Sequence, residues 1–282
     1  MKHVLERLDP TDCAILARVA KPWLAVVVAN NLPRAGTVEG AVKLKLVDFV
    51  RSVERLAWAK DNGCPVQTSP TCAYIAMGGH LEVLQWARQQ GCQWGSATCA
   101  RAAENGHLEV LQWARKQGCS WSSSTCEGAA ENGHLGVLQW AREHHCPWDE
   151  ATCFLAAANG HLEVLKWARE HHCRWDGETR HQAARGGHLE VLKWARQQGC
   201  RWDSTTCERA AENGHLEVLQ WAREQGCPWD KGTCRAAARG GQLGVLRWAR
   251  KHNCPWAAGR CAIMADEGGH VQVAQWIRAQ AP

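Results

Sequence analysis

A 27-residue unit recurs along most of this chain, and that period constrains the fold more than any other feature of the sequence. One copy reads TCARAAENGHLEVLQWAR at residues 98–115. A single copy is too small to bury its own apolar face, so consecutive copies must stack into a solenoid with a continuous core. We therefore expect equivalent side chains of successive units to form rows along the stack.

The unusual composition is a consequence of the repeat. Nine of the 17 Trp occupy one position of the unit and seven occupy a second, and two further positions hold fifteen of the 16 Cys. So many cysteines would indicate disulfides in a small secreted protein, but Lys2, Glu6, Arg7 and Asp9 stand where a secretory signal would be apolar. We expect a soluble intracellular protein, cytoplasmic or nuclear, with reduced and mostly buried thiols and no membrane association.

Each unit is expected to form two helices. The apolar residues of 108–114 cover more than half of a helix circumference, which is typical of a helix packed on several sides. The preceding segment is short and rich in Ala, which allows neighbouring first helices to approach closely. Gly106 is expected to end the first helix in a left-handed conformation, and the position of Gly118, which His145 and His172 fill in other units, is expected to end the second.

These features resemble the ankyrin repeat. The matching segments are Ala102-Ala103, Asn105-Gly106-His107, Leu108-Glu109-Val110-Leu111 and Gly118-Cys119, and the resemblance covers residues 44–282. It implies an all-α, right-handed solenoid of stacked helix-turn-helix repeats. Because the unit is shorter than the usual ankyrin period of about 33 residues, long β-hairpin fingers should be missing, and Thr-Cys replaces the usual Thr-Pro-Leu-His. Arrays of similarly short period are found in unicellular algae and giant DNA viruses.

The first 40 residues do not share the repeat, so we predict a helical N-terminal segment at 1–40 and the solenoid at 41–282, with an N-terminal cap at 41–64. The segment resembles an F-box, the helical module that docks a protein onto the adaptor of SCF-type ubiquitin ligases. The adaptor contact would involve Leu5, Leu8, Pro10, Ile15, Val19 and Trp23. The alternative is a helical cap over the apolar end of the first repeat.

Specificity should lie where the copies differ within this chain. The differing positions fall in the first helix, which faces the concave side in ankyrin-like stacks, and their mixture of apolar, acidic and basic types suits a protein or peptide ligand. Neutral drift of surface residues is the alternative. The predicted partner-binding residues are Tyr74, Met77, Arg101, Glu104, Glu127, Glu131, Phe154, Leu155, His181, Arg185, Glu208, Arg209, Arg235 and Arg239.

No enzyme constellation is present in the sequence, and no cofactor is expected, because the row of Glu109 and its equivalents is explained by the period. The net charge is +5, but acidic and basic residues alternate along the units and form no basic block, which argues against a nucleic-acid ligand. We expect a monomeric, non-catalytic binding scaffold, and the F-box resemblance implies that it recruits a target to a ubiquitin ligase.

Metal or redox chemistry at the Cys and His rows is the main rival hypothesis. Equivalent residues of stacked helices lie about 10 Å apart, too far for one zinc ion to bridge, so we interpret the Cys rows as core packing and the His row as a junction that binds backbone. Six residues at two neighbouring helix ends are weak metal candidates, namely His144, His145, Cys146, His171, His172 and Cys173. The alternative is that these His side chains are solvated and are favoured at the helix ends by the helix dipole. The second Trp row is expected to be buried, although exposed indoles could bind a partner.

Overall fold

The computed structural model describes residues 50–61 and 66–280 of the chain, and these residues form 17 helices and no strand. The F-box-like segment and half of the predicted cap, residues 41–49 and 62–64, lie outside the described residues. Contacts divide the chain into two compact units, one up to Thr98 and one from Cys99 onward. Within the described ranges, no helix has the length and apolar character needed to cross a lipid bilayer.

The described part of the first unit contains the helices α4 (Val53–Asp61), α5 (Ser69–Met77) and α6 (Leu81–Gln89). Helix α4 follows the pattern of a second helix, as predicted, and the Oγ atom of Ser52 accepts a hydrogen bond of 3.3 Å from the backbone N–H of Arg55. Helix α6 packs against both α4 and α5.

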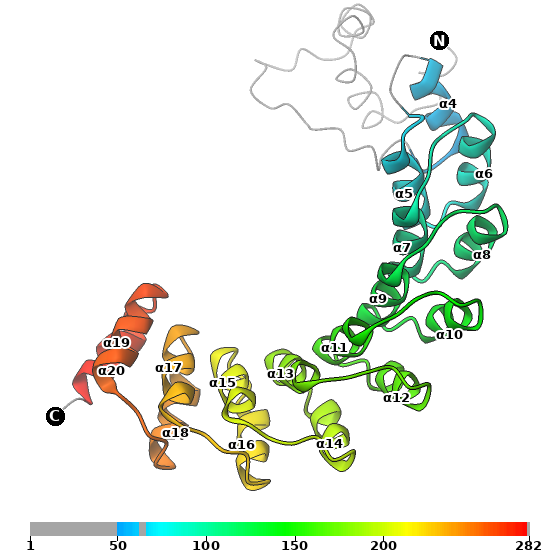
Figure 1. Ribbon diagram of the computed structural model, residues 1–282. Helices are drawn as coiled ribbons and strands as arrows, with labels where there is room; N and C mark the ends of the chain where they lie inside the picture. The colour runs from blue at the N-terminus through cyan, green and yellow to red at the C-terminus, as the bar shows by residue number, and fades with distance from the viewer. Residues whose placement is uncertain (1–49, 62–65, 281–282) are drawn as a thin grey trace, which may run out of the picture. The chain divides into compact units, whose positions relative to one another are not determined.

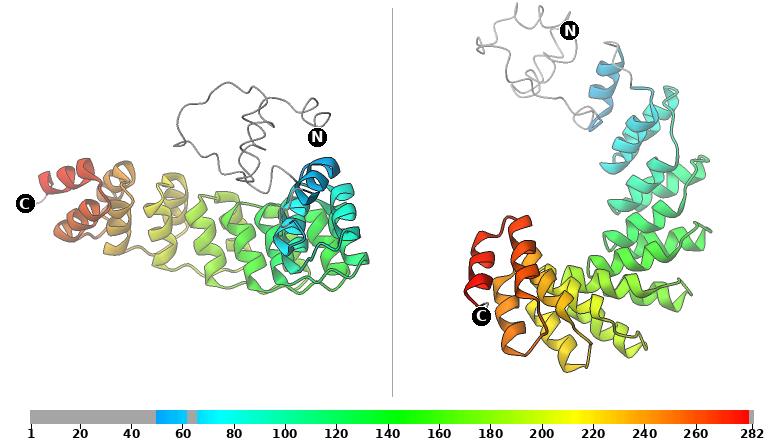
Figure 2. Two further views of the ribbon diagram at one scale, coloured as in Figure 1. Left: turned by 90° about the horizontal axis from the view of Figure 1, so that it is seen from above. Right: turned by 60° about the vertical axis from the view of Figure 1, so that its left-hand side comes forward.

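The second unit repeats one pair of helices. First helices pack against the first helices of the neighbouring pairs and lie on the inner side of the curve of this unit (Figure 1). Pairs follow one another in chain order from green to red in the turned views (Figure 2). The first helices are α7 (Ser96–Glu104, which begins before the division), α9 (Ser123–Glu131), α11 (Glu150–Ala158), α13 (Gly177–Gly186), α15 (Ser204–Glu212), α17 (Lys231–Arg239) and α19 (Ala258–Glu267). The second helices are α8 (Leu108–Lys116), α10 (Leu135–Glu143), α12 (Leu162–Glu170), α14 (Leu189–Gln197), α16 (Leu216–Glu224), α18 (Leu243–Lys251) and α20 (Val271–Ala279).

Burial follows the repeat. The first helices α9, α11, α15 and α17 bury their Thr, Cys and paired Ala side chains, which are small enough for close approach of the helices. The second helices from α6 to α18 bury a Val, a Leu and a following Ala side chain, and α20 buries Val273, Ala274 and Ile277 instead. Where the second residue of the helix is Glu, as in α12, that side chain is exposed. Leu165 is 0% exposed. The core is therefore a continuous layer between the two rows of helices, as the sequence predicts.

The junction between the helices of a pair is left-handed, as predicted. Gly133 has φ +75°, and the imidazole of His161, one unit later, lies over it. The Nε2–H of His161 donates a 3.0 Å hydrogen bond to the carbonyl oxygen of Glu131. His188 binds Ala158 in the same way at 2.8 Å. The His row therefore ties each unit to the backbone of the preceding one, which confirms its interpretation as a backbone-binding junction.

The second helices from α6 to α18 also end at a left-handed residue, with φ +81° at Gly118, +65° at His145 and +60° at Asn253. The connection that follows caps the next first helix. The Asp149 carboxylate accepts a hydrogen bond from the backbone N–H of Ala151 at 3.0 Å, as carboxylates at helix starts commonly do. The last two positions of the His row, Gln242 and His270, are 28 residues apart instead of 27, and the first helix between them, α19, has ten residues.

Candidate interaction surface

The candidate site is the first-helix face, which we define as the solvent-accessible side chains of α9, α11, α13, α15 and α17. Every partner-binding residue predicted from the sequence keeps some solvent exposure, and Tyr74, in the first unit, is 39% exposed. The Thr, Cys and Ala residues that recur in the same helices are buried instead. Residues that vary between units and residues that recur therefore occupy different sides of each first helix.

Charge is unevenly distributed along this face. Glu127 and Glu131 of α9 form no salt bridge with any described residue, and the same holds for Arg185 of α13 and Arg235 of α17. Between them, α11 carries the apolar, half-buried Phe154. The side chains without a salt bridge thus run from acidic on α9, past the apolar Phe154, to basic on α13 and α17, with the half-buried Glu208 of α15 between the two basic helices.

Some charges of the face neutralise one another. The Arg239 guanidinium of α17 lies 2.9 Å from the Glu212 carboxylate of α15, and Arg209 lies 3.5 Å from the same group. In α7, Arg101 and Glu104 are paired at 2.6 Å. These exposed pairs contribute little to stability, but they leave fewer charges free to meet a ligand.

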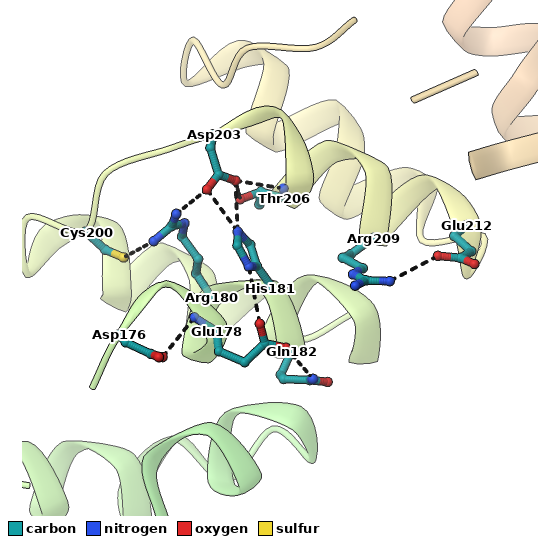
Figure 3. Close-up of polar contacts among 10 residues, drawn as sticks. All are labelled: Asp176, Glu178, Arg180, His181, Gln182, Cys200, Asp203, Thr206, Arg209 and Glu212. Carbon is teal, nitrogen blue, oxygen red and sulfur yellow. Dashed lines mark hydrogen bonds and ion pairs between the residues drawn. The ribbon is translucent and has the colours of Figure 1, made fainter. Parts of the chain in front are cut away.

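Helix α13 departs from the repeat, because Arg180 occupies the position where the other units carry a buried Cys. Arg180 forms an ion pair with Asp203 at the start of α15. The Nε2 atom of His181 lies 2.9 Å from Oδ1 of the same carboxylate, and its Nδ1 atom lies 3.6 Å from Glu178. Figure 3 shows the Arg180 and His181 side chains of α13 converging on Asp203, with Glu178 on the other side of His181. We call Glu178, Arg180, His181 and Asp203 the α13–α15 polar cluster.

The polar cluster is electrostatically self-contained. Burial on its own would raise the pKa of Asp203, but hydrogen bonds from His181 and Arg180 outweigh it and hold that pKa below its ordinary value. Burial would likewise lower the pKa of Arg180, yet its pKa is raised because the Asp203 carboxylate favours the charged guanidinium. The cluster therefore joins two units and fixes His181 in place. Sequence reasoning found His181 but missed its partners, although Arg180 is visible as the one break in a Cys row.

The two Cys rows face each other, which sequence reasoning also missed. The Sγ atoms of Cys207 in α15 and Cys227 in the connection after α16 lie 3.4 Å apart, and those of Cys72 and Cys92 lie 3.0 Å apart. The constant offset of 20 residues between the two rows is the sequence signal of this pairing. Within residues 66–280, the Cys side chains are buried, except that Cys200 is half-buried.

The second Trp row lies wedged between consecutive second helices. The ring of Trp148 receives the Arg142 guanidinium at 4.3 Å from its centroid and meets the ring of Trp167 edge-on at 5.8 Å. Arg142 also donates a hydrogen bond to the carbonyl oxygen of Cys146. The indoles of this row are half-buried, so they act in packing between units while keeping one edge in solvent.

The six weak metal candidates are not brought together. His144 stacks on Trp140 at 4.2 Å and its Nδ1–H donates to the Trp140 carbonyl at 2.8 Å. His145 is the left-handed residue that ends α10, and Cys146 is buried. The next unit repeats this arrangement with His171, His172 and Cys173. Within the described part of the chain, no group of three or more potential ligand side chains could hold a metal ion.

Comparison with known proteins yields a fold but no relative in sequence. No protein-family profile matches the chain, and no curated protein matches it. Among solved structures, the ankyrin repeat domain of human ASB11 superposes with a TM-score of 0.50 at 16% sequence identity, covering 65% of this chain and 98% of that domain. At this identity the likeness shows the fold alone, and the chain has the ankyrin-repeat fold.

Proposed function

We propose that this chain is a non-catalytic scaffold that binds a protein or peptide on its first-helix face. One observation carries the proposal: on the first helices, the Thr, Cys and Ala side chains that recur between units are buried, whereas the side chains that vary keep solvent exposure. Exposed variation on a rigid row of helices is what a recognition surface needs, because the scaffold holds the side chains in fixed positions.

The distribution of charge indicates the kind of partner. Glu127 and Glu131 would attract basic side chains, Phe154 would contact an apolar one, and Arg185 and Arg235 would attract acidic ones. We infer a ligand segment that presents basic, apolar and acidic groups in this order along the direction from α9 to α17. Aromatic and Arg side chains carry a large share of the energy in many interfaces, so Phe154 and Arg185 are the expected anchors.

Matched charge reversals test this proposal. Glu131→Arg reverses a charge on first helix α9, and Glu163→Arg reverses an exposed charge on second helix α12. Partners captured from cells by the wild-type chain should be lost with Glu131→Arg and with Arg185→Glu, and retained with Glu163→Arg. Loss with all three variants, or with Glu163→Arg alone, would place binding elsewhere and refute the proposal.

A ubiquitin-ligase adaptor role is a second candidate, supported by the sequence pattern of residues 5–23, which lie outside the described residues. In that role the segment would dock on the SCF-type adaptor while the repeats recruit a target. Co-purification with the adaptor should be lost on Trp23→Ala or on deletion of residues 1–30. Absence of the adaptor from wild-type preparations would remove this candidate and leave the binding surface of the repeats untouched.

Two experiments address the rival classes. A nucleic-acid ligand would show retention that weakens steeply with salt, and we expect no retention at low salt because the first-helix face carries acidic side chains as well as basic ones. A metalloprotein would show stoichiometric metal in elemental analysis of the purified protein, and we expect none because the Cys and His side chains are engaged in packing and backbone contacts.

A further inference from the structure

Two cysteine thiols face each other inside most units of the array. The Sγ atoms of Cys207 and Cys227 are 3.4 Å apart, and both side chains are buried. A disulfide requires a separation of about 2 Å, so a small displacement would bring the two sulfur atoms to bonding distance. Four other pairs share the offset of 20 residues and are close enough for one thiol to raise the pKa of the other, namely Cys99–Cys119, Cys126–Cys146, Cys153–Cys173 and Cys234–Cys254.

The two thiols of a pair are not equivalent. The hydrogen bond from Cys207 holds the pKa of Cys227 below its ordinary value, with support from the Arg223 guanidinium. The same hydrogen bond, together with burial, raises the pKa of Cys207. The thiolate is the reactive form of cysteine. Cys227 is therefore placed to react first, with Cys207 in contact to complete the reaction.

We propose that each facing pair of thiols is an oxidation site, at which hydrogen peroxide joins the two cysteines of one unit in a disulfide. The Cys227 thiolate attacks peroxide, the O–O bond breaks, and a sulfenic acid and hydroxide form. The Cys207 sulfur then attacks the Cys227 sulfur, the S–O bond breaks, and the oxygen leaves as water. In total, two thiols and one peroxide give one disulfide and two waters. Peroxide reaches the buried sulfur atoms during local opening of the unit.

The disulfide would change the mechanics of the array. Cys207 belongs to first helix α15, whereas Cys227 lies in the connection that leads to α17, so the bond closes a loop around α16. A cross-link of this kind restricts the opened state. An oxidised unit should consequently open less often than a reduced one, and an oxidant would stiffen the array one unit at a time without altering the first-helix face.

The chain contains its own control. In the unit of α13 and α14, Arg180 replaces the helix cysteine, and its Nη1 atom lies 3.9 Å from Sγ of Cys200. Cys200 thus faces a guanidinium where Cys92 and Cys227, at the equivalent position of other units, face a thiol. Being half-buried, it is also more accessible than they are. Accessibility alone would favour Cys200 for reaction, whereas pairing favours Cys207 with Cys227.

The test treats the reduced full chain with hydrogen peroxide, blocks the remaining thiols by alkylation and maps the tryptic peptides by mass spectrometry. We expect a linked peptide that joins residues 207 and 227 with the loss of two hydrogens, and no disulfide at Cys200. Arg180→Cys should gain a new link between positions 180 and 200, and Cys207→Ser should leave Cys227 as a sulfenic acid that dimedone traps.

Two results would overturn the proposal. The first is the absence of the 207–227 link at peroxide doses that oxidise Cys200. The second is linkage of Cys207 to cysteines that it does not face as often as to Cys227, which would indicate oxidation of unfolded chains. Because Arg180→Cys adds a pair while Cys207→Ser removes one, misfolding of either variant leaves the other as an independent test, and circular dichroism monitors both.

Discussion

Gly118 and Gly133 share a left-handed backbone conformation but differ in their surroundings, so the stability of Ala variants at the two positions can be compared directly. Gly118 ends a second helix with φ +81°, and a Cβ atom added there would meet nothing within 4 Å. Gly133 ends a first helix with φ +75°, but an added Cβ would lie 2.6 Å from Nδ1 of His161. The same backbone conformation is therefore required at both positions, while only Gly133 lies against a neighbouring unit.

We predict that Gly118→Ala destabilises the chain by about 1 kcal/mol, the usual cost of a left-handed conformation for an L-residue. Gly133→Ala should cost the same and, in addition, displace His161 from the carbonyl of Glu131, which adds about 1 kcal/mol for a lost hydrogen bond. The loss of freedom in the unfolded chain is equal for the two variants, so the difference between them isolates the contact between units.

Urea unfolding followed by far-UV circular dichroism measures both variants against the wild type. We expect Gly133→Ala to unfold at a distinctly lower urea concentration than Gly118→Ala. When each variant is combined with His161→Ala, most of that difference should disappear. Equal losses for the two Ala variants, or a larger loss for Gly118→Ala, would refute the argument that His161 locks one unit onto the next.

Three further perturbations have defined outcomes. Trp148→Ala should destabilise the chain by about 3 kcal/mol, measured by urea unfolding, since it removes the contacts with Arg142 and Trp167. Asp203→Asn should destabilise the chain at neutral pH, and the variant and wild type should converge in thermal unfolding below the ordinary Asp value of 3.8, because a lowered folded pKa gives stability that is lost as pH falls. Glu208→Gln should stabilise the chain at neutral pH, because burial and the nearby Asp230 raise the pKa of this carboxyl. That gain should shrink as the pH falls towards the ordinary Glu value of 4.5, at which the wild-type carboxyl also becomes protonated.

The fold was predictable because the period removes most of the freedom in interpreting the sequence. A helix pair per 27 residues, a left-handed Gly106 and a His row that binds backbone all follow from patterns within one unit. Even the substitution of Gly118 by His145 in the next unit is explained, since open space surrounds Gly118 and a side chain there meets no obstacle. Local rules suffice for features whose partners lie close in sequence.

The missed features all depend on contacts between distant positions. The facing of Cys207 and Cys227 depends on how the connection folds back over α15, which periodicity within a helix does not specify. The candidate binding residues could be chosen from the sequence because variation within one chain is visible, but their pairing was not, as Arg239 and Glu212 show.

Native-state alkylation of every cysteine, quantified by mass spectrometry, tests most directly whether the recurring residues build a stacked core. We predict that Cys200 reacts fastest among the cysteines of residues 66–280, because it alone of these is half-buried. The other cysteines of this range should react only as the chain unfolds. Alkylation of Cys126, Cys153 or Cys207 in the folded protein as fast as in an unfolded peptide would contradict the account, because it would place these side chains in solvent instead of between the helices.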